Sequence, residues 1–317
     1  MTRSVTREDV VAAAARIDEA VEHTPLVASH IAGTRVWLKC ESMQTGGAFK
    51  LRGATNRLMQ LTAVERTAGV VAFSSGNHAQ GVAIAAERLG IPATIVMPSD
   101  APAIKVDNTR AHGADIIFYD RMTESRETIA AKLAAEKGAV VVPSFDDPHI
   151  VAGQGTVGLE ILTQLADLGE PAPTTIAVPV GGGGLASGIA LACPEAAIIG
   201  AEPEGWDDMR RSLEAGKIVP VEPDAPRTLC DALQTPRVSP ITFGILQDRK
   251  ALVVAVSEAE VTQAVRWAWK HHQLIVEPGG AAALAAVLAG KAPPSEGIVI
   301  ILSGSNIDPA LHARLVG

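Results

Sequence analysis

The 317-residue sequence is poor in aromatic side chains, which make up 3% of it, and it has only three cysteines. Proteins that bind single-stranded nucleic acid use aromatic side chains as stacking platforms, so the low aromatic content disfavours that class. Cys40, Cys193 and Cys230 lie far apart, and no CxxC or Cys/His cluster is present. Neither a disulfide framework nor a zinc site is therefore indicated.

Long apolar runs and an excess of basic charge are also missing. The longest apolar segments, such as 281–290, are shorter than the roughly 20 residues that span a bilayer. The N-terminal segment lacks the apolar core of a secretory signal. Lysine and arginine number 27 against 35 aspartate and glutamate, a formal net charge of -8, which disfavours a nucleic-acid or anionic-membrane surface. We therefore expect a cytoplasmic protein with a small-molecule substrate and no nucleic-acid or membrane partner.

Short runs of β-branched residues alternate along the chain with alanine-rich segments of helical periodicity. Apolar strands that alternate with helices indicate an α/β protein with a parallel sheet covered on both faces. Ligands of such sheets bind at the carboxyl ends of the strands, so the residues that follow strands are the candidates for function. We expect strands at 36–41, 70–74, 93–97, 116–119, 140–143, 175–180, 197–202, 252–256 and 298–302, and helices at 79–89, 104–111, 125–136, 157–168, 258–272 and 280–289.

One strand-to-helix junction places Lys50 at the start of a helical pattern, between Phe49 and Leu51. A lysine near a helix N-terminus and among apolar side chains has a lowered pKa, which suits Schiff-base chemistry. The alternative is a solvated lysine on a first helical turn, and this alternative is favoured for a single lysine without context.

A second junction reads Ser74-Ser75-Gly76-Asn77-His78, between a buried strand and an alanine-rich helix. Side-chain oxygens and free backbone N–H groups at a helix start suit a carboxylate or phosphate oxygen. The same residues also form an ordinary helix cap. Read alone, the segment fits both interpretations equally.

Four consecutive glycines, Gly181–Gly184, separate another buried strand from a helix. Their entropic cost is poorly explained by a turn alone and better explained by a backbone that wraps around a phosphate. No GxxxxGK[ST] motif is present, so a nucleoside-triphosphate loop is excluded. However, the spacing of Gly181, Gly183 and Ala186, with Glu202 ending the next strand, loosely matches a dinucleotide fingerprint. An NAD-dependent oxidoreductase is therefore an alternative from another class.

Two further features have two readings each. Ser303, at the end of the last buried strand, has a hydroxyl that can hydrogen-bond a ligand ring nitrogen or cap the next helix, and capping is favoured for the segment alone. Asp207 and Asp208, with Glu202, offer oxygen ligands for a hard cation. The alternative, a solvated acidic loop, is slightly favoured.

Taken together, these junctions resemble the serine racemase and threonine/serine dehydratase family, which are pyridoxal-phosphate enzymes of the tryptophan synthase β-like fold (fold type II). The motifs AFKLRGA, SSGNHAQG, AGQGT, VGGGG and AEP…DD occur in the family's order between His23 and Asp308. The resemblance implies two open, twisted, mostly parallel sheets with helices on both faces. It also implies a large cofactor-binding domain (1–68 and 144–317), a small inserted domain (69–143) and a homodimer or homotetramer.

The resemblance also assigns roles to individual residues. Lys50 forms the Schiff base with pyridoxal phosphate, and Phe49 packs beside the cofactor ring. Asn77 hydrogen-bonds the ring 3′-oxygen, and Ser303 faces the pyridine nitrogen. The phosphate is held by Gly181, Gly182, Gly183, Gly184 and the amide of Leu185.

Substrate and cation sites follow from the same resemblance. Ser75 lies on the ring face opposite Lys50 and is the second catalytic residue. The substrate carboxylate is framed by Ser74, Ser75, Gly76 and His78. A magnesium, calcium or manganese ion is bound by Glu202, Asp208 and the carbonyl of Trp206.

The implied activity is the dehydration of a β-hydroxy amino acid to a 2-oxo acid and ammonia, with Lys50 as general base. If Ser75 reprotonates the other face of Cα, the outcome is racemisation, which is the alternative main activity. A β-replacement enzyme like cysteine synthase is disfavoured, because its asparagine loop usually reads TSGNTG.

The substrate stays open among serine, threonine and 3-hydroxyaspartate. The lysine motif reads GGAFK where the family usually has TGSFK, so Gly46 and Ala48 change the surroundings of the substrate carboxylate. Arg126 stands where some family members have an arginine that reaches a second carboxylate, which would favour 3-hydroxyaspartate. Pairing of Arg126 with Glu124 or Glu127 on the surface is slightly favoured and points to serine or threonine.

Overall fold

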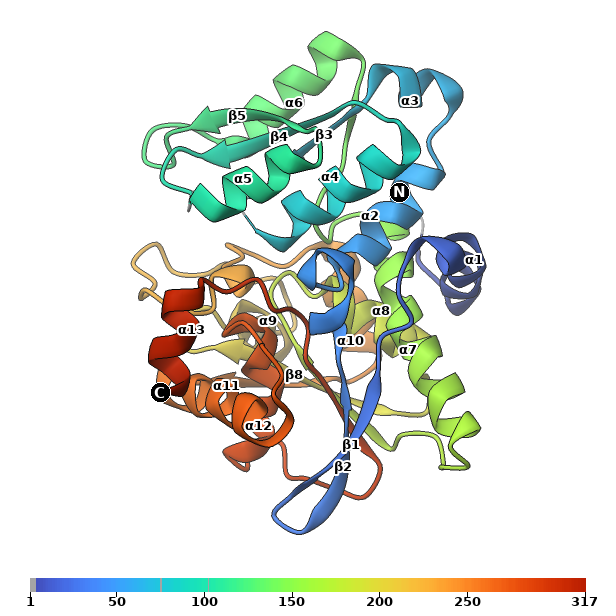
Figure 1. Ribbon diagram of the computed structural model, residues 1–317, viewed down its shortest axis with the longest axis vertical. Helices are drawn as coiled ribbons and strands as arrows, with labels where there is room; N and C mark the ends of the chain where they lie inside the picture. Colours follow the sequence, from blue (N-terminus) through green and yellow to red (C-terminus); the bar gives the residue numbers. More distant parts are fainter. Residues whose placement is uncertain (1–3, 75, 102) are drawn as a thin grey trace.

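The computed structural model describes residues 4–74, 76–101 and 103–317. Within these ranges the strands form two sheets, and every pairing is parallel except that of β1 with β2. Helices cover both faces of the sheets (Figure 1). The expected α/β fold with two mostly parallel sheets is therefore confirmed.

Each sheet has its own segment of the chain. The six-stranded sheet has the order β1 (Leu26–Ile31), β2 (Thr34–Lys39), β10 (Ile298–Ile301), β7 (Thr175–Pro179), β8 (Ala197–Pro203) and β9 (Leu252–Val256). The four-stranded sheet has the order β5 (Asp115–Tyr119), β4 (Ala93–Pro98), β3 (Val70–Phe73) and β6 (Val140–Val141).

The helices fill the connections between strands. The α-helices are α1 (Arg7–Ile17), α2 (Lys50–Met59), α3 (Ala63–Ala68), α4 (Asn77–Leu89), α5 (Ala103–Ala111), α6 (Arg126–Lys137), α7 (Pro148–Asp167), α8 (Gly184–Ala192), α9 (Asp208–Ala215), α10 (Pro240–Asp248), α11 (Glu258–His272), α12 (Ala282–Leu288) and α13 (Pro309–Val316). Short 3₁₀ segments are η1 (Asp18–Ala20), η2 (Glu41–Met43), η3 (Thr45–Gly47), η4 (Asp231–Leu233) and η5 (Gly279–Ala281).

Strand β10 shows why the six-stranded sheet needs helices on both faces. Its four residues are all fully buried, yet alternate side chains enter different cores. Val299 and Ile301 pack into the core that contains α1, α7 and α8. Ile298 and Ile300 pack into the opposite core with α11 and α12. The period of two in a strand produces this division, and it explains the continuous apolar run in the sequence.

Most expected elements are present, and the differences have local causes. Helix α11 has the expected bounds, since the side chains and backbones of Ser257 and Glu260 cap each other. Helix α7 starts nine residues before the expected 157, because Asp147 caps it and Pro148 occupies its first turn. Gly155 hides this helix in the sequence. A Cβ there would lie 2.7 Å from the carbonyl oxygen of Gly188, so the glycine permits close contact of α7 with α8.

The three cysteines are free and buried. Burial raises the pKa of each thiol to about 12, so the thiols stay protonated and unreactive. No helix in the part of the chain that the structure describes is long and apolar enough to cross a membrane.

Candidate active site

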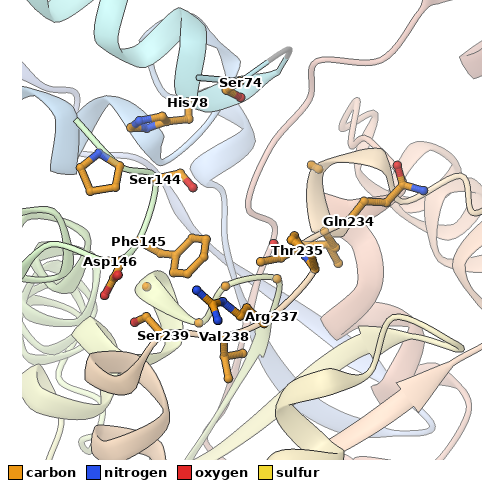
Figure 2. Close-up of a pocket in the computed structure, with 18 of the residues that line it drawn as sticks. Ser74, His78, Ser144, Phe145, Asp146, Gln234, Thr235, Arg237, Val238 and Ser239 are labelled. Atoms are coloured by element: carbon orange, nitrogen blue, oxygen red, sulfur yellow. The ribbon is translucent and has the colours of Figure 1, made fainter. Parts of the chain in front are cut away.

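A cavity of about 650 Å³ opens where strands of both sheets end. Phe73 at the end of β3, Pro179 at the end of β7 and Ser303 just after β10 all line it. Figure 2 shows Ser74 and His78 on one side of the cavity and the segment from Thr235 to Ser239 on another. The site thus lies at the carboxyl ends of the strands, where ligands of α/β sheets bind.

The cavity brings together most of the residues that the sequence singles out. Ser75, the expected second catalytic residue, lies outside the described residues. Glu202, Trp206 and Asp208 do not line the cavity. The expected residues that do line it are Phe49, Lys50, Ser74, Gly76, Asn77, His78, Arg126, Gly181, Gly182, Gly183, Gly184, Leu185 and Ser303.

Lys50 is the first residue of α2 and projects its amine into the cavity wall. The residue as a whole is half-buried, but its amine is enclosed by protein and donates a 3.0 Å hydrogen bond to the carbonyl oxygen of Ser144. Its Nζ atom is 5.2 Å from the ring centre of Phe49. Burial lowers the pKa of Lys50 to about 8. A large fraction of the amine is therefore neutral and nucleophilic near neutral pH.

The glycine loop Gly181–Gly184 leads directly into α8 and forms the floor of the cavity. A Cβ at Gly182 would overlap the ring of Phe145, and Gly183 has a φ of +85°, so side chains are excluded at both positions. The first N–H groups of a helix have no intrahelical acceptor, and the helix dipole favours an anion there. The loop therefore fits a phosphate group that is held by backbone N–H groups.

Asn77 is held by two partners on the cavity wall. Its Nδ2 donates to Oε1 of Glu277, and its Oδ1 accepts from Nδ2 of Asn306 at 2.8 Å. Burial, reinforced by the carboxylate of Asp231, raises the pKa of Glu277 to about 8. The sequence analysis misses Glu277, because a single glutamate before a proline reads as a loop residue and lies 200 positions from Asn77.

His78 is 2% exposed and neutral. Burial, with the nearby Lys50 amine, lowers the pKa of its ring to about 3. Its Nε2 lies 2.8 Å from the carbonyl oxygen of Val142, so Nε2 carries the proton and Nδ1 is an acceptor. Nδ1 has no hydrogen-bond partner within the described chain. A substrate carboxylate at this position would therefore be bound by backbone N–H groups rather than by the ring.

Arg126 combines the two positions that its sequence leaves open. Its Nε donates a 2.9 Å hydrogen bond to the carboxylate of Glu127, as the surface interpretation expects. Its guanidinium carbon lies 5.6 Å from the ring centre of Phe73, and the residue also lines the cavity. The arginine thus reaches the cavity, with its charge already paired.

Glu202 and Asp208 are 0% and 1% exposed, so the interpretation as a solvated acidic loop is wrong for this pair. Glu202 accepts hydrogen bonds from the backbone N–H groups of Met209 and Arg210, at 3.0 and 2.9 Å. Burial and the Asp208 carboxylate raise the pKa of Glu202 well above its usual value.

Asp208 has the better vacant ligand atoms of this pair. Burial raises its pKa to about 7, although the nearby backbone N–H of Val238 acts in the other direction. Neither carboxylate oxygen has a hydrogen-bond partner of normal geometry in the described chain. Residues 4–74, 76–101 and 103–317 contain no cluster of three or more acidic, His or Cys side chains that would hold a metal. A cation at Asp208 would therefore need carbonyl oxygens as well.

Comparison with known proteins places these residues in a family context. The chain matches the family model described as "Pyridoxal-phosphate dependent enzyme" over residues 17–304. It is 42% identical to L-threo-3-hydroxyaspartate ammonia-lyase of a Pseudomonas species, with 97% of each chain covered. It is 38% identical to serine racemase of Schizosaccharomyces pombe, with 98% of this chain and 97% of the relative covered.

Solved structures agree with this assignment. Maize serine racemase superposes with a TM-score of 0.90 at 37% identity, over 98% of this chain and 97% of that one. Serine racemase of Dictyostelium discoideum superposes with a TM-score of 0.88 at 33% identity, over 96% and 100%. A bacterial-type threonine deaminase without a further domain also superposes with a TM-score of 0.88, at 41% identity, over 96% and 99%.

These relatives confirm the expected activity class, a pyridoxal-phosphate-dependent dehydratase with racemases among its relatives. The alternative of an NAD-dependent oxidoreductase finds no support, since Glu202 is fully buried against α9 and is not free to bind a ribose. The chain belongs to the family of pyridoxal-phosphate-dependent enzymes.

Proposed function

We propose that this protein is an ammonia-lyase that converts 3-hydroxyaspartate to ammonia and a four-carbon 2-oxo diacid. The water lost in the elimination is returned on hydrolysis, so the net products are the 2-oxo acid and ammonia. The observation that carries the proposal is the amine of Lys50, with its pKa of about 8, in the same cavity as the glycine loop Gly181–Gly184.

The residues of the cavity fit pyridoxal phosphate. Lys50 would hold the cofactor covalently, with Phe49 beside the ring and the glycine loop with the amide of Leu185 around the phosphate. Asn77 would face the ring 3′-oxygen, and Ser303, which is 5% exposed, the pyridine nitrogen. The bound cofactor supplies an electron sink that makes the Cα proton of an amino acid removable.

The chain's own groups would perform the proton transfers. The neutral amine of Lys50 accepts the Cα proton, and the carbonyl oxygen of Ser144 holds this amine in position. Backbone N–H groups at the start of α4, next to Ser74 and Gly76, bind the α-carboxylate. Departure of the β-hydroxyl needs a proton donor, and Ser75 is the candidate.

A dicarboxylic substrate is favoured by the relatives and by charge. L-threo-3-hydroxyaspartate ammonia-lyases of Pseudomonas and Saccharomyces cerevisiae are 42% and 40% identical, and the β-hydroxyaspartate dehydratase of Paracoccus denitrificans is 37% identical. Two arginines, Arg126 and Arg237, line the cavity. Guanidinium groups bind carboxylates with two parallel hydrogen bonds, so their presence supports a second carboxylate. L-Serine and L-threonine are the alternative substrates, since relatives named for them are also similar.

Three further features belong to this proposal. Racemisation is a second activity, supported by the serine racemases among the relatives, with Ser75 as the proton donor on the face opposite Lys50. A divalent cation is bound by Glu202, Asp208 and the carbonyl of Trp206, supported by the vacant oxygens of Asp208. The assembly is a homodimer or homotetramer of a cytoplasmic enzyme.

The test begins with the purified holoprotein. It should be yellow, absorb near roughly 410 nm and lose that band with borohydride, with modification at Lys50. Release of 2-oxo acid is then measured from L-threo-3-hydroxyaspartate, L-serine and L-threonine, and the chirality of unreacted substrate is followed. A colourless protein would overturn the cofactor assignment, and a higher kcat/KM for L-serine than for 3-hydroxyaspartate would overturn the substrate.

A further inference from the structure

Arg237 is a cavity residue that the family motifs do not include. It lies between η4 and α10 and is exposed, yet it lines the cavity together with Phe145. Figure 2 shows its guanidinium directed toward Phe145 rather than away from the cavity. The side chain is thus placed at the cavity mouth, with its charged end toward the space that a ligand would occupy.

The charge of Arg237 is not used by the protein itself. Arg126 pairs with Glu127, and Lys105, at the rim, pairs with Asp231. By contrast, Arg237 makes no ion pair or hydrogen bond with any described residue. An arginine that faces a cavity without a counter-charge is suited to a carboxylate that arrives with the ligand.

The backbone around Arg237 is fixed on both sides. The carbonyl oxygen of Pro236 accepts a 2.9 Å hydrogen bond from the N–H of Val221. Val238 is 1% exposed, and Ser239 caps α10 through reciprocal hydrogen bonds with Thr242. Because both neighbours are anchored, the guanidinium is presented to the cavity from a fixed position, which lowers the entropic cost of binding.

The position of Arg237 separates it from both other anion sites of the cavity. The phosphate floor at Gly182–Gly184 is buried and supplies its own N–H groups, whereas Arg237 is exposed at the mouth. The α-carboxylate site lies near Ser74 and His78, which Figure 2 places on a different side of the cavity. An amino acid with a carboxylate at each end would fit between the two.

We propose that Arg237 binds the side-chain carboxylate of the substrate and thereby makes the enzyme select a β-hydroxy dicarboxylic amino acid over serine and threonine. This inference rests on the proposed function, and it assigns the selectivity to Arg237 rather than to the paired Arg126. Substrates without the second carboxylate leave this guanidinium in water and gain nothing from it.

The test compares Arg237→Gln with the control Arg227→Gln. Arg227 is an exposed arginine of the same connection that does not line the cavity. The ratio of kcat/KM for L-threo-3-hydroxyaspartate to that for L-serine should fall about 10- to 100-fold in Arg237→Gln, mainly through KM, because a charge-assisted hydrogen bond is lost. Arg237→Lys should recover part of the ratio, and Arg227→Gln should keep the wild-type ratio.

The alternatives give different results. An unchanged ratio in Arg237→Gln, in a wild-type enzyme that prefers 3-hydroxyaspartate, overturns the role of Arg237 and leaves the proposed function intact. A selective loss in Arg126→Gln instead would transfer the role to Arg126. An equal loss for both substrates, with weaker binding of pyridoxal phosphate in an absorbance titration, would assign Arg237 to the cofactor phosphate. A wild-type enzyme that prefers L-serine would overturn both the substrate proposal and this inference.

Discussion

The amine of Lys50 donates its hydrogen bond to the carbonyl oxygen of Ser144, 3.0 Å away, rather than to a carboxylate. A carboxylate would stabilise the ammonium form, whereas a neutral carbonyl in a buried place compensates less for the loss of water. Burial accordingly lowers the pKa of Lys50 to about 8. The nearest wall of the cavity therefore favours the form of the lysine that reacts.

This pKa can be measured in the cofactor-free protein. The rate at which Lys50 is acylated should rise with pH and reach half its maximum near pH 8, whereas an ordinary lysine does so near pH 10.4. Competitive labelling followed by mass spectrometry gives the profile, and the exposed Lys132 in the same digest corrects for loss of reagent. A midpoint near 10.4 for Lys50 would show that its amine is not desolvated.

Gly182→Ala should weaken both cofactor binding and folding. The added methyl group would overlap the ring of Phe145, so either this ring or the glycine loop must move. Overpacking of this kind costs about 1–3 kcal/mol, and a displaced loop no longer presents its N–H groups to a phosphate. Urea unfolding of the apoprotein and an absorbance titration with pyridoxal phosphate measure the two effects.

Gly244→Ala is the matched control for this substitution. Gly244 lies inside α10, and a Cβ there meets nothing within 4 Å, so alanine should be neutral or slightly stabilising in a helix. If both variants bound the cofactor like the wild type, the close packing of Phe145 on the loop would have no functional role.

The parts of the site that can be predicted from the sequence are those with unusual residue types after a strand. Lys50 and Gly181–Gly184 stand out because a lysine and four glycines interrupt apolar patterns. Glu277 and Arg237 cannot be found in this way. Each is an ordinary polar residue beside a proline, and only the folded chain brings Glu277 to Asn77 and Arg237 to the cavity.

The same limit applies to the fold. Buried parallel strands are recognisable as β-branched runs, but β1 is partly exposed at the sheet edge and lacks this signal. The first half of helix α7 is not recognised, because its glycines, which permit contact with α8, resemble helix breakers. The division into a small domain at 69–143 and a large domain stays a prediction.

Glu277→Gln should change the pH dependence of stability. Burial raises the pKa of Glu277 to about 8 in the folded protein, against an ordinary value near 4.3 in the unfolded chain. Between these values the unfolded chain releases the proton and the folded protein keeps it, so the wild type loses stability as pH rises from about 4.5 to 8. Glutamine keeps the hydrogen bond to Asn77 without a titrating group.

The free energy of unfolding of the apoprotein, measured by urea at several pH values, tests this relation. The advantage of Glu277→Gln over the wild type should grow from about pH 4.5 to about pH 8, by an amount on the order of a few kcal/mol, and then level off. A constant difference across this range would show that Glu277 is ionised in the folded protein at all these pH values.

Asp208→Asn should remove a stabilisation by divalent cations. Both oxygens of Asp208 are buried without hydrogen-bond partners of normal geometry, and the Asp208 carboxylate lies close enough to Glu202 to raise the pKa of Glu202 by repulsion. A bound cation would offset this repulsion, so Mg²⁺, Ca²⁺ or Mn²⁺ should raise the Tm of chelator-treated protein. At about 100 times the dissociation constant the gain is about 2.7 kcal/mol. The Tm of Asp208→Asn should not respond, whereas Asp224→Asn, on an exposed loop, should respond like the wild type. A wild-type Tm that is indifferent to all three cations would mean that the two carboxyls share protons instead of a metal.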